Sequence, residues 1–220
     1  MIKEKPEHKF FDRMLDNNLD ELHKYLTQKN KEILSGDFPN INKDNIEYIK
    51  SQFGFVSVTQ LGARYNIFDF GNESINKIQL ALKDLTKEAC DHYGINFEEQ
   101  DYVIHGWFNF DPNIGIKGST PMLDDDSIFH DHAQGHGAPD FHGYYCVKAE
   151  PSITYYKINN GSDIFENHNI DNRVLVSETG HPHSVGTWAE KDVRITIAYD
   201  IMPSKSVSHY DDFDMIWIPL

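Results

Sequence analysis

Val193-Arg194-Ile195-Thr196-Ile197-Ala198-Tyr199-Asp200 is the stretch that decides the fold of this 220-residue chain. Successive side chains of a β-strand point to opposite faces, and in this stretch the apolar residues recur at every second position. The apolar face carries Val193, Ile195, Ile197 and Tyr199. Arg194 and Thr196 share the other face, where a guanidinium fork beside a hydroxyl makes a good receptor for a carboxylate. The alternative role for Arg194 is a salt bridge to one of the many acidic residues.

The same β character extends through the second half of the chain. From residue 101 onward, short segments rich in β-branched and aromatic residues are separated by Gly, Pro and Asn turns, without long intervening helices. This spacing is typical of an antiparallel sandwich or barrel, so we expect a mainly β fold with flanking helices. The predicted strands are Tyr102–Phe110, His142–Lys148, Ser152–Ile158, Arg173–Glu178, Ser184–Trp188, Val193–Met202 and Met215–Ile218.

The first hundred residues are expected to support this β region. Apolar residues recur at helical spacing across residues 10–30 and again across 75–93, where Gly94 is placed to end the second helix. Asn42 is placed to cap a short helix between them. The segment Phe55–Phe70 is rich in β-branched and aromatic residues, which suits strands.

Length and charge restrict the class of protein further. A chain of 220 residues can bury a proper core, and we expect residues 1–220 to form a single domain. The formal net charge is −15, with 20 basic against 35 acidic residues. Sequence-independent nucleic-acid binding is not expected, because phosphates need Lys and Arg to neutralise them. The same charge argues against binding to an anionic membrane surface.

Cysteine content and the start of the chain bear on its location. Cys90 and Cys146 lie far apart, and we expect two reduced thiols, as in a cytosolic protein. We find no apolar run of transmembrane length, and the first residues, Met1–Lys5, lead into charged sequence, unlike a signal peptide. The expected location is therefore the cytoplasm.

Histidines are concentrated in one part of the chain. Seven of the twelve fall between positions 130 and 183, in and between the segments Phe129–His136 and Gly180–Val185. Imidazole is a common ligand for borderline metals, so a cluster split between two segments indicates a metal site that the fold assembles. A His-rich surface loop without a function is the simpler alternative. We expect a solvated loop at the acidic run Asp124–Asp126 in the same region.

The spacing within the cluster indicates which histidines bind the metal. His130 and His132 are two residues apart, so in an extended segment they point the same way and can converge on one ion. Asp131 would then point away unless the segment turns. His183 could complete the set from another strand, and ligands on one face of an ion suit non-haem Fe(II) and oxygen chemistry. His136, His142 and His181 are expected as loop residues or as supports of the ligands.

Several segments in order resemble the 2-oxoglutarate/Fe(II)-dependent oxygenase superfamily, in particular its phage and bacterial branch. The resemblance implies a double-stranded β-helix, a jelly-roll or cupin-like fold with helices packed on one sheet. Residues 101–220 would form the jelly-roll core, and residues 1–100 would form a helical and β support region packed on it. The matching segments are Trp107-Phe108-Asn109, His130-Asp131-His132, His142–Val147, Arg173–Glu178, His183-Ser184-Val185 and Arg194-Ile195-Thr196.

The resemblance also implies roles for individual residues. His183 matches the distal iron ligand, and Arg194, with Thr196 beside it, matches the residue that holds the far carboxylate of 2-oxoglutarate. The proximal motif of most of the superfamily is His-x-Asp or His-x-Glu, whereas here it is His-x-His. His130 matches its first position, and the third ligand is either His132 or Asp131. The barrel lining near the cosubstrate or substrate is expected to include three further residues: Tyr144, Asn109 and Tyr155.

The activity implied is that of a non-haem Fe(II) hydroxylase that consumes 2-oxoglutarate and O2 and releases succinate and CO2. The substrate would be a small molecule or a protein side chain. One alternative is a three-histidine cupin-type dioxygenase that uses no 2-oxoglutarate. Another is a non-enzymatic jelly-roll protein whose metal is structural.

Overall fold

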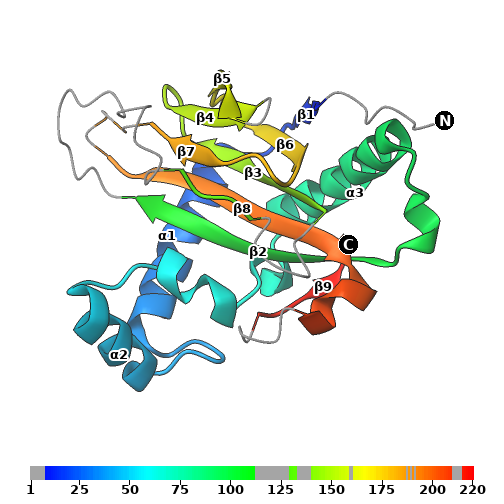
Figure 1. Ribbon diagram of the computed structural model, residues 1–220. Helices are drawn as coiled ribbons and strands as arrows, with labels where there is room; N and C mark the ends of the chain where they lie inside the picture. Colours follow the sequence, from blue (N-terminus) through cyan, green and yellow to red (C-terminus); the bar gives the residue numbers. More distant parts are fainter. Residues whose placement is uncertain are drawn as a thin grey trace.

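Two antiparallel sheets form the centre of the molecule, as the computed structural model in Figure 1 shows. The structure describes residues 8–111, 129–132, 140–158, 161–186, 188, 190, 192–209 and 215–220. Asp124–Asp126 and His136 lie outside these residues. The larger sheet has the strand order β1 (Phe10–Met14), β6 (Arg173–Glu178), β3 (Phe141–Lys148), β8 (Arg194–Pro203), β2 (Tyr102–Asp111) and β9 (Ile218–Pro219). The smaller sheet has the order β5 (Asp163–His168), β4 (Ile153–Ile158) and β7 (His183–Val185).

Helices cover one face of the larger sheet and form the N-terminal part of the chain. In Figure 1, α1 and α3 lie on the side of this sheet away from β4, β5 and β7. The α-helices are α1 (Leu19–Ser35), α2 (Lys43–Phe53) and α3 (Glu73–Tyr93). The 3₁₀ helices are η1 (Thr59–Arg64), η2 (Ile67–Phe70), η3 (Phe97–Glu99) and η6 (Ser204–His209). The predicted fold class, mainly β with flanking helices, is confirmed. The division into a support region and a core at residue 100 stays a prediction.

The core lies between α1, α3 and the larger sheet. One apolar side of β8 faces it, with Ile195, Ile197 and Tyr199 fully buried. Leu26 of α1 and Leu82 of α3 belong to the same buried cluster. The alternation seen in the sequence of β8 therefore leaves its other face directed away from the helices, towards the smaller sheet.

Capping residues set the ends of the helices. The Asn42 side chain accepts a hydrogen bond from the Asn45 backbone and begins α2, as predicted. The Asn72 side chain likewise accepts from the first turn of α3, and Gly94, at φ 69°, ends that helix in the left-handed conformation. The helix predicted at 75–93 is thus confirmed.

Two elements differ from the sequence predictions. Residues 10–30 do not form one helix, because Phe10–Met14 pairs with β6 as an edge strand and Asn18 starts α1 afterwards. The segment Phe55–Phe70 contains 3₁₀ turns where strands were predicted. Asn66 favours these turns, since its side chain accepts from the Phe68 backbone and donates to carbonyls of distant segments.

The predicted strands after residue 101 are present with shifted ends. β7 stops at Val185, so Trp188 lies beyond it, and only Ile218–Pro219 pairs in the last segment. β5 was not predicted, because it is a mostly exposed, polar strand at the edge of the smaller sheet. Its sequence lacks the apolar alternation that marks a half-buried strand.

Candidate active site

A pocket of about 560 Å³ opens between the two sheets. Its walls come from the polar face of β8, the neighbouring strands β2 and β3, and the facing strands β4 and β7. Four histidines of the cluster and the Arg194 strand face, both singled out in the sequence, line this one pocket; the four are His130, His132, His142 and His183. The lining residues are Thr59, Trp107, Asn109, Asp111, His130, His132, His142, Gly143, Tyr144, Thr154, His183, Val185, Gly186, Trp188, Arg194, Thr196 and Ala198.

Backbone pairing brings the two distant histidine segments together. The His130 amide donates to the His183 carbonyl at 3.0 Å, and the His183 amide donates to the His130 carbonyl at 2.8 Å. Their rings lie 4.2 Å apart between centroids. Residue His132 follows two positions later, and one ring nitrogen from each of the three histidines lies within 4.8 Å of the others. The three predicted imidazoles therefore converge on one point.

Asp131, the alternative ligand in the sequence analysis, points elsewhere. Its carboxylate accepts a hydrogen bond from the Gly180 amide at 3.3 Å. This hydrogen bond joins the segment before β7 to the segment that contains His130. His130 and His132 thus line the pocket, while the carboxylate of Asp131 between them contacts Gly180.

Asp200 supports His132 from the adjacent strand β8. The Asp200 carboxylate lies 2.6 Å from Nδ1 of His132, and only 6% of the Asp200 side chain is exposed. Burial lowers the pKa of His132, but the charge and hydrogen bond of Asp200 outweigh it and raise the pKa above its usual value. The contact occupies Nδ1 and so leaves Nε2 of His132 for a metal. Asp200 was not predicted as a site residue, although it lies within β8, the strand that decides the fold.

The other two imidazoles are kept neutral. Burial, followed by the nearby His130 and His132, lowers the pKa of His183 well below its usual range. Burial, and then His132, lowers that of His130. A neutral imidazole offers a lone pair to a metal, whereas imidazolium does not. His130 and His183 therefore favour the form that binds a cation, whereas the raised pKa of His132 favours the protonated form, from which a cation would have to displace a proton.

A fourth histidine forms the floor of the cluster. His142 is 3% exposed, and its ring centroid lies 5.0 Å from that of His132 and 4.9 Å from that of His183. Burial, then the charge of His183, lowers its pKa well below the usual value. Its Nε2 has no hydrogen-bond partner among the described residues. His142 thus presents a neutral ring nitrogen, without a hydrogen-bond partner in the described part of the chain, close to the three converging imidazoles.

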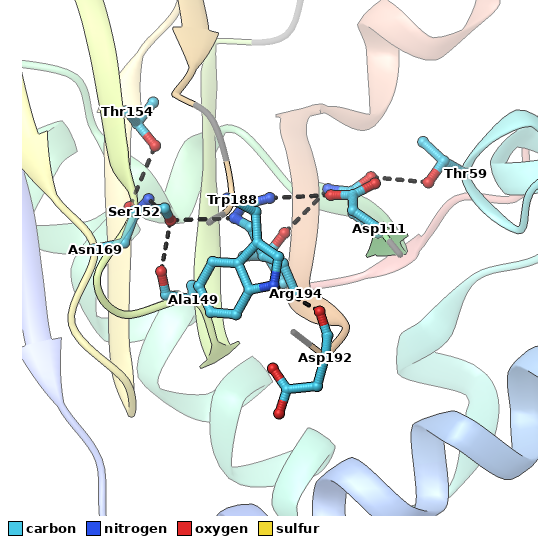
Figure 2. A network of polar contacts seen from close by, with 11 residues as sticks. Thr59, Asp111, Ala149, Ser152, Thr154, Asn169, Trp188, Asp192 and Arg194 are labelled. Atoms are coloured by element: carbon cyan, nitrogen blue, oxygen red, sulfur yellow. Dashed lines mark hydrogen bonds and ion pairs between the residues drawn. The ribbon is translucent and has the colours of Figure 1, made fainter. Parts of the chain in front are cut away.

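Arg194 lies in the same pocket with its guanidinium held in place. The residue is 4% exposed; Nε donates to Ser152 Oγ at 3.2 Å, and Nη1 donates to Asp111 Oδ2 at 3.1 Å. Figure 2 shows this network, in which Ser152 is itself tied to Ala149 and Asn169. The Asp111 side chain is 52% exposed, so this ion pair faces water on one side. Arg194 therefore both lines the pocket and makes the salt bridge named as its alternative role.

Of the three other residues predicted to line the barrel, two line the pocket and one does not, according to the face of the strand on which each lies. Asn109 donates from Nδ2 to the Thr196 hydroxyl at 3.1 Å, next to Arg194. Tyr144 also lines the pocket, and burial raises the pKa of its phenol to about 12, so it remains protonated. Tyr155 is not among the lining residues, because its neighbour Thr154 occupies the inward-facing position of β4.

Together, a larger and a smaller antiparallel sheet that face each other across the pocket define a double-stranded β-helix. The solved structures that the chain resembles have this fold. One is a prolyl hydroxylase from Trichoplax adhaerens in complex with a hypoxia inducible factor peptide fragment, at TM-score 0.54 and 15% identity, covering 93% of this chain and 87% of that one. The predicted jelly-roll is confirmed.

Two further solved structures are similar. The non-heme alpha ketoglutarate dependent epimerase SnoN from nogalamycin biosynthesis matches at TM-score 0.52 and 10% identity, covering 91% of this chain and 79% of that one. The nickel complex of the non-heme monooxygenase ThoJ matches at TM-score 0.51 and 11% identity, covering 90% and 74%. At these identities the similarity establishes the fold.

Comparisons by sequence give no match. No protein-family model matches the chain, and no curated protein matches it. Within the described part of the chain, no helix is both long and apolar enough to span a membrane.

Proposed function

We propose that this protein is a non-haem Fe(II) oxygenase that uses 2-oxoglutarate and O2 to hydroxylate a substrate. One observation carries the proposal: three converging imidazoles and a buried arginine line a single pocket of a double-stranded β-helix. The metal ligands assigned are His130, His132 and His183. Arg194 and Thr196 are assigned to the far carboxylate of 2-oxoglutarate.

The residues present fit a divalent iron. Imidazole nitrogen binds ferrous iron, and three ligands from one side leave positions open for other groups. A carboxylate ligand, usual in such enzymes, would bring a negative charge that three imidazoles lack. The Asp200 carboxylate supplies this charge without touching the metal, because it contacts Nδ1 of the proposed ligand His132. Bound iron would supply the oxygen activation that accompanies decarboxylation of 2-oxoglutarate to succinate.

The protein's part in the reaction is binding and orientation. The Arg194 fork can hold a carboxylate through two parallel hydrogen bonds, and its Nε–Ser152 contact fixes the plane of the guanidinium. The Thr196 hydroxyl, already in contact with Asn109, lies beside it. Trp107 stacks near His132, with centroids 6.0 Å apart and planes 14° apart, and so forms an apolar wall at the metal end. The substrate assigned to this space is a small molecule or a protein side chain.

The direct test is formation of succinate. Purified protein with Fe(II), ascorbate and oxygen is expected to convert 2-oxoglutarate slowly to succinate even without a substrate. The matched controls omit iron or replace it with Zn²⁺, which has no redox chemistry. An absence of iron-dependent succinate, together with an absence of 2-oxoglutarate binding, would contradict the proposal.

A three-histidine dioxygenase without 2-oxoglutarate is the second candidate. The ligand set without a carboxylate favours it, as does the existing contact of Arg194 with Asp111. This candidate leaves Arg194 with a structural role only. It predicts oxygen consumption with a substrate that does not depend on 2-oxoglutarate, and an unchanged calorimetric baseline when 2-oxoglutarate is added.

Asp111→Asn is expected to strengthen 2-oxoglutarate binding up to about fivefold. Asp111 competes for the guanidinium, and an ion pair with one half-exposed partner contributes about 1 kcal/mol or less. Calorimetry on protein loaded with Mn²⁺ would measure the change. Asp84→Asn is the matched control, because Asp84 pairs with the exposed Arg13 far from the pocket. Weaker binding in Asp111→Asn would instead make Asp111 part of the receptor.

Asp200→Ala is expected to lower metal affinity by about 10- to 100-fold, because the group that orients and polarises His132 is lost. Asp200→Asn keeps an acceptor for the Nδ1 hydrogen of His132 but removes the charge, so it should lower the metal affinity less than Asp200→Ala does. Competition with a chelating dye would give both affinities. Equal metal affinities in wild type and both variants would show that Asp200 does not support metal binding.

A further inference from the structure

A second group of metal-binding side chains lies outside the pocket, where β6 turns towards β7. His8, Glu178 and His181 each offer one ligand atom, and these atoms lie within 4.8 Å of one another. None of the three lines the pocket. We propose that this group binds one zinc-class divalent cation, at a site that is separate from the proposed iron centre and does not depend on it.

The sheet register brings these residues together from opposite ends of the chain. β1 runs antiparallel to β6 with Phe10 opposite Ser177, so two residues earlier His8 lies beside the chain that leaves β6. Gly180, at φ 90°, turns the chain there, between Glu178 and His181. A side chain with Cβ rarely adopts this backbone conformation, so the turn depends on glycine.

Neighbouring aromatic side chains hold His8 in position. The rings of His8 and His181 lie 3.8 Å apart between centroids, and His8 contacts the edge of Phe10 at 4.7 Å. Phe10 in turn packs on Tyr156 at 4.8 Å and Phe165 at 4.9 Å, from the smaller sheet. Two imidazoles in close contact, with a carboxylate beside them, are therefore held by packing that does not involve a metal.

The chemistry of the three ligands suits zinc. Two histidines and one glutamate with a water in the fourth position are an established zinc-binding set, with bonds of about 2.1 Å. Tetrahedral ligands at that distance lie roughly 3.4 Å apart. The three ligand atoms lie within 4.8 Å of one another, so rotation of the Glu178 side chain and of the two imidazole rings would bring them to this spacing when an ion binds. All three residues are partly exposed, which gives a cation access from solvent.

Zinc is the cation expected to fill this site. For a given set of nitrogen and oxygen ligands, Zn²⁺ binds more tightly than Fe²⁺. The net charge of −15 also raises the local concentration of cations around the protein. A bound ion would join the N-terminal strand β1 to the turn that ends two residues before His183. The site would therefore act as a clamp that raises the unfolding temperature.

Zinc titration by calorimetry tests the proposal. Wild type is expected to bind one more zinc than His8→Ala, and Glu178→Gln, which removes the charge at nearly constant shape, should bind at this site at least about tenfold more weakly. His168→Ala is the matched control, since His168 is exposed on β5 outside both groups. Its stoichiometry should equal that of wild type.

A second measurement guards against misfolding of a variant. Zinc should raise the unfolding temperature of wild type by more than that of His8→Ala, because an ion that binds only the folded state stabilises it. Equal zinc stoichiometry and equal thermal shifts in wild type, His8→Ala and Glu178→Gln would overturn the proposal. His183→Ala should keep the clamp zinc, so loss of the iron centre and loss of this site are distinguishable.

Discussion

His183→Ala is expected to abolish iron-dependent succinate formation and to weaken metal binding in the pocket at least about a hundredfold. A structural zinc with four ligands is bound with about 10–16 kcal/mol, so one ligand accounts for roughly 3 kcal/mol, or more than two powers of ten in affinity. His183 is also the residue whose backbone pairs with His130, but a substitution by alanine keeps that pairing. The fold should therefore survive.

Two measurements check this prediction. Iron retained after anaerobic gel filtration reports the affinity, and succinate formation reports the activity. His168→Ala is the control, because it removes an imidazole that is exposed on β5 and lies outside the pocket; this variant should behave as wild type. If His183→Ala retained iron and succinate formation at the wild-type level, the ligand set proposed for the pocket would be wrong.

Arg194→Ala is expected to weaken 2-oxoglutarate binding by roughly ten- to two-hundredfold while metal binding persists. A hydrogen bond to a charged group contributes about 1.5–3 kcal/mol, which corresponds to that range of affinity. Metal binding should persist because Arg194 contacts Ser152 and Asp111 and none of the three histidines. Calorimetry with 2-oxoglutarate on Mn²⁺-loaded protein gives the affinity.

Arg194→Lys sharpens the same test. Lysine keeps the charge but lacks the planar fork of arginine. The affinity of Arg194→Lys for 2-oxoglutarate should therefore fall between those of wild type and Arg194→Ala. Retained metal binding in both variants serves as the control for folding. Unchanged 2-oxoglutarate affinity in Arg194→Ala, or no binding in wild type, would favour the three-histidine dioxygenase or the non-enzymatic protein.

The strand Val193–Asp200 and the helix α3 could be predicted from sequence because local patterns decide them. In the strand, alternation fixes which face is apolar, and the structure buries Ile195 and Ile197 as that pattern predicts. In the helix, a long apolar stripe ends at a glycine that adopts the left-handed cap. Both signals come from neighbours in the chain, so they need no knowledge of the tertiary fold.

β1 and the segment Phe55–Phe70 could not be predicted in this way. The apolar spacing of residues 10–14 fits a helix equally well, and the hydrogen bonds that make them a strand come from β6, more than 150 residues away. In Phe55–Phe70 the residue types favour strands, but hydrogen bonds from Asn66 to carbonyls of distant segments favour turns. Long-range contacts overrode local preference in both places.

The sequence by itself determined the fold class, the two histidine segments and the face of Arg194, because alternation along a strand is a property of the backbone alone. Only the tertiary structure shows how the candidate ligands are arranged. Gly180 donates to Asp131, whereas His132 contacts Asp200 and lies with His130 and His183, and this arrangement supports the proposal of His132 over Asp131 as a ligand. These contacts join residues about fifty and seventy positions apart. They form only when the sheets bring those segments together, so no local pattern in the sequence encodes them.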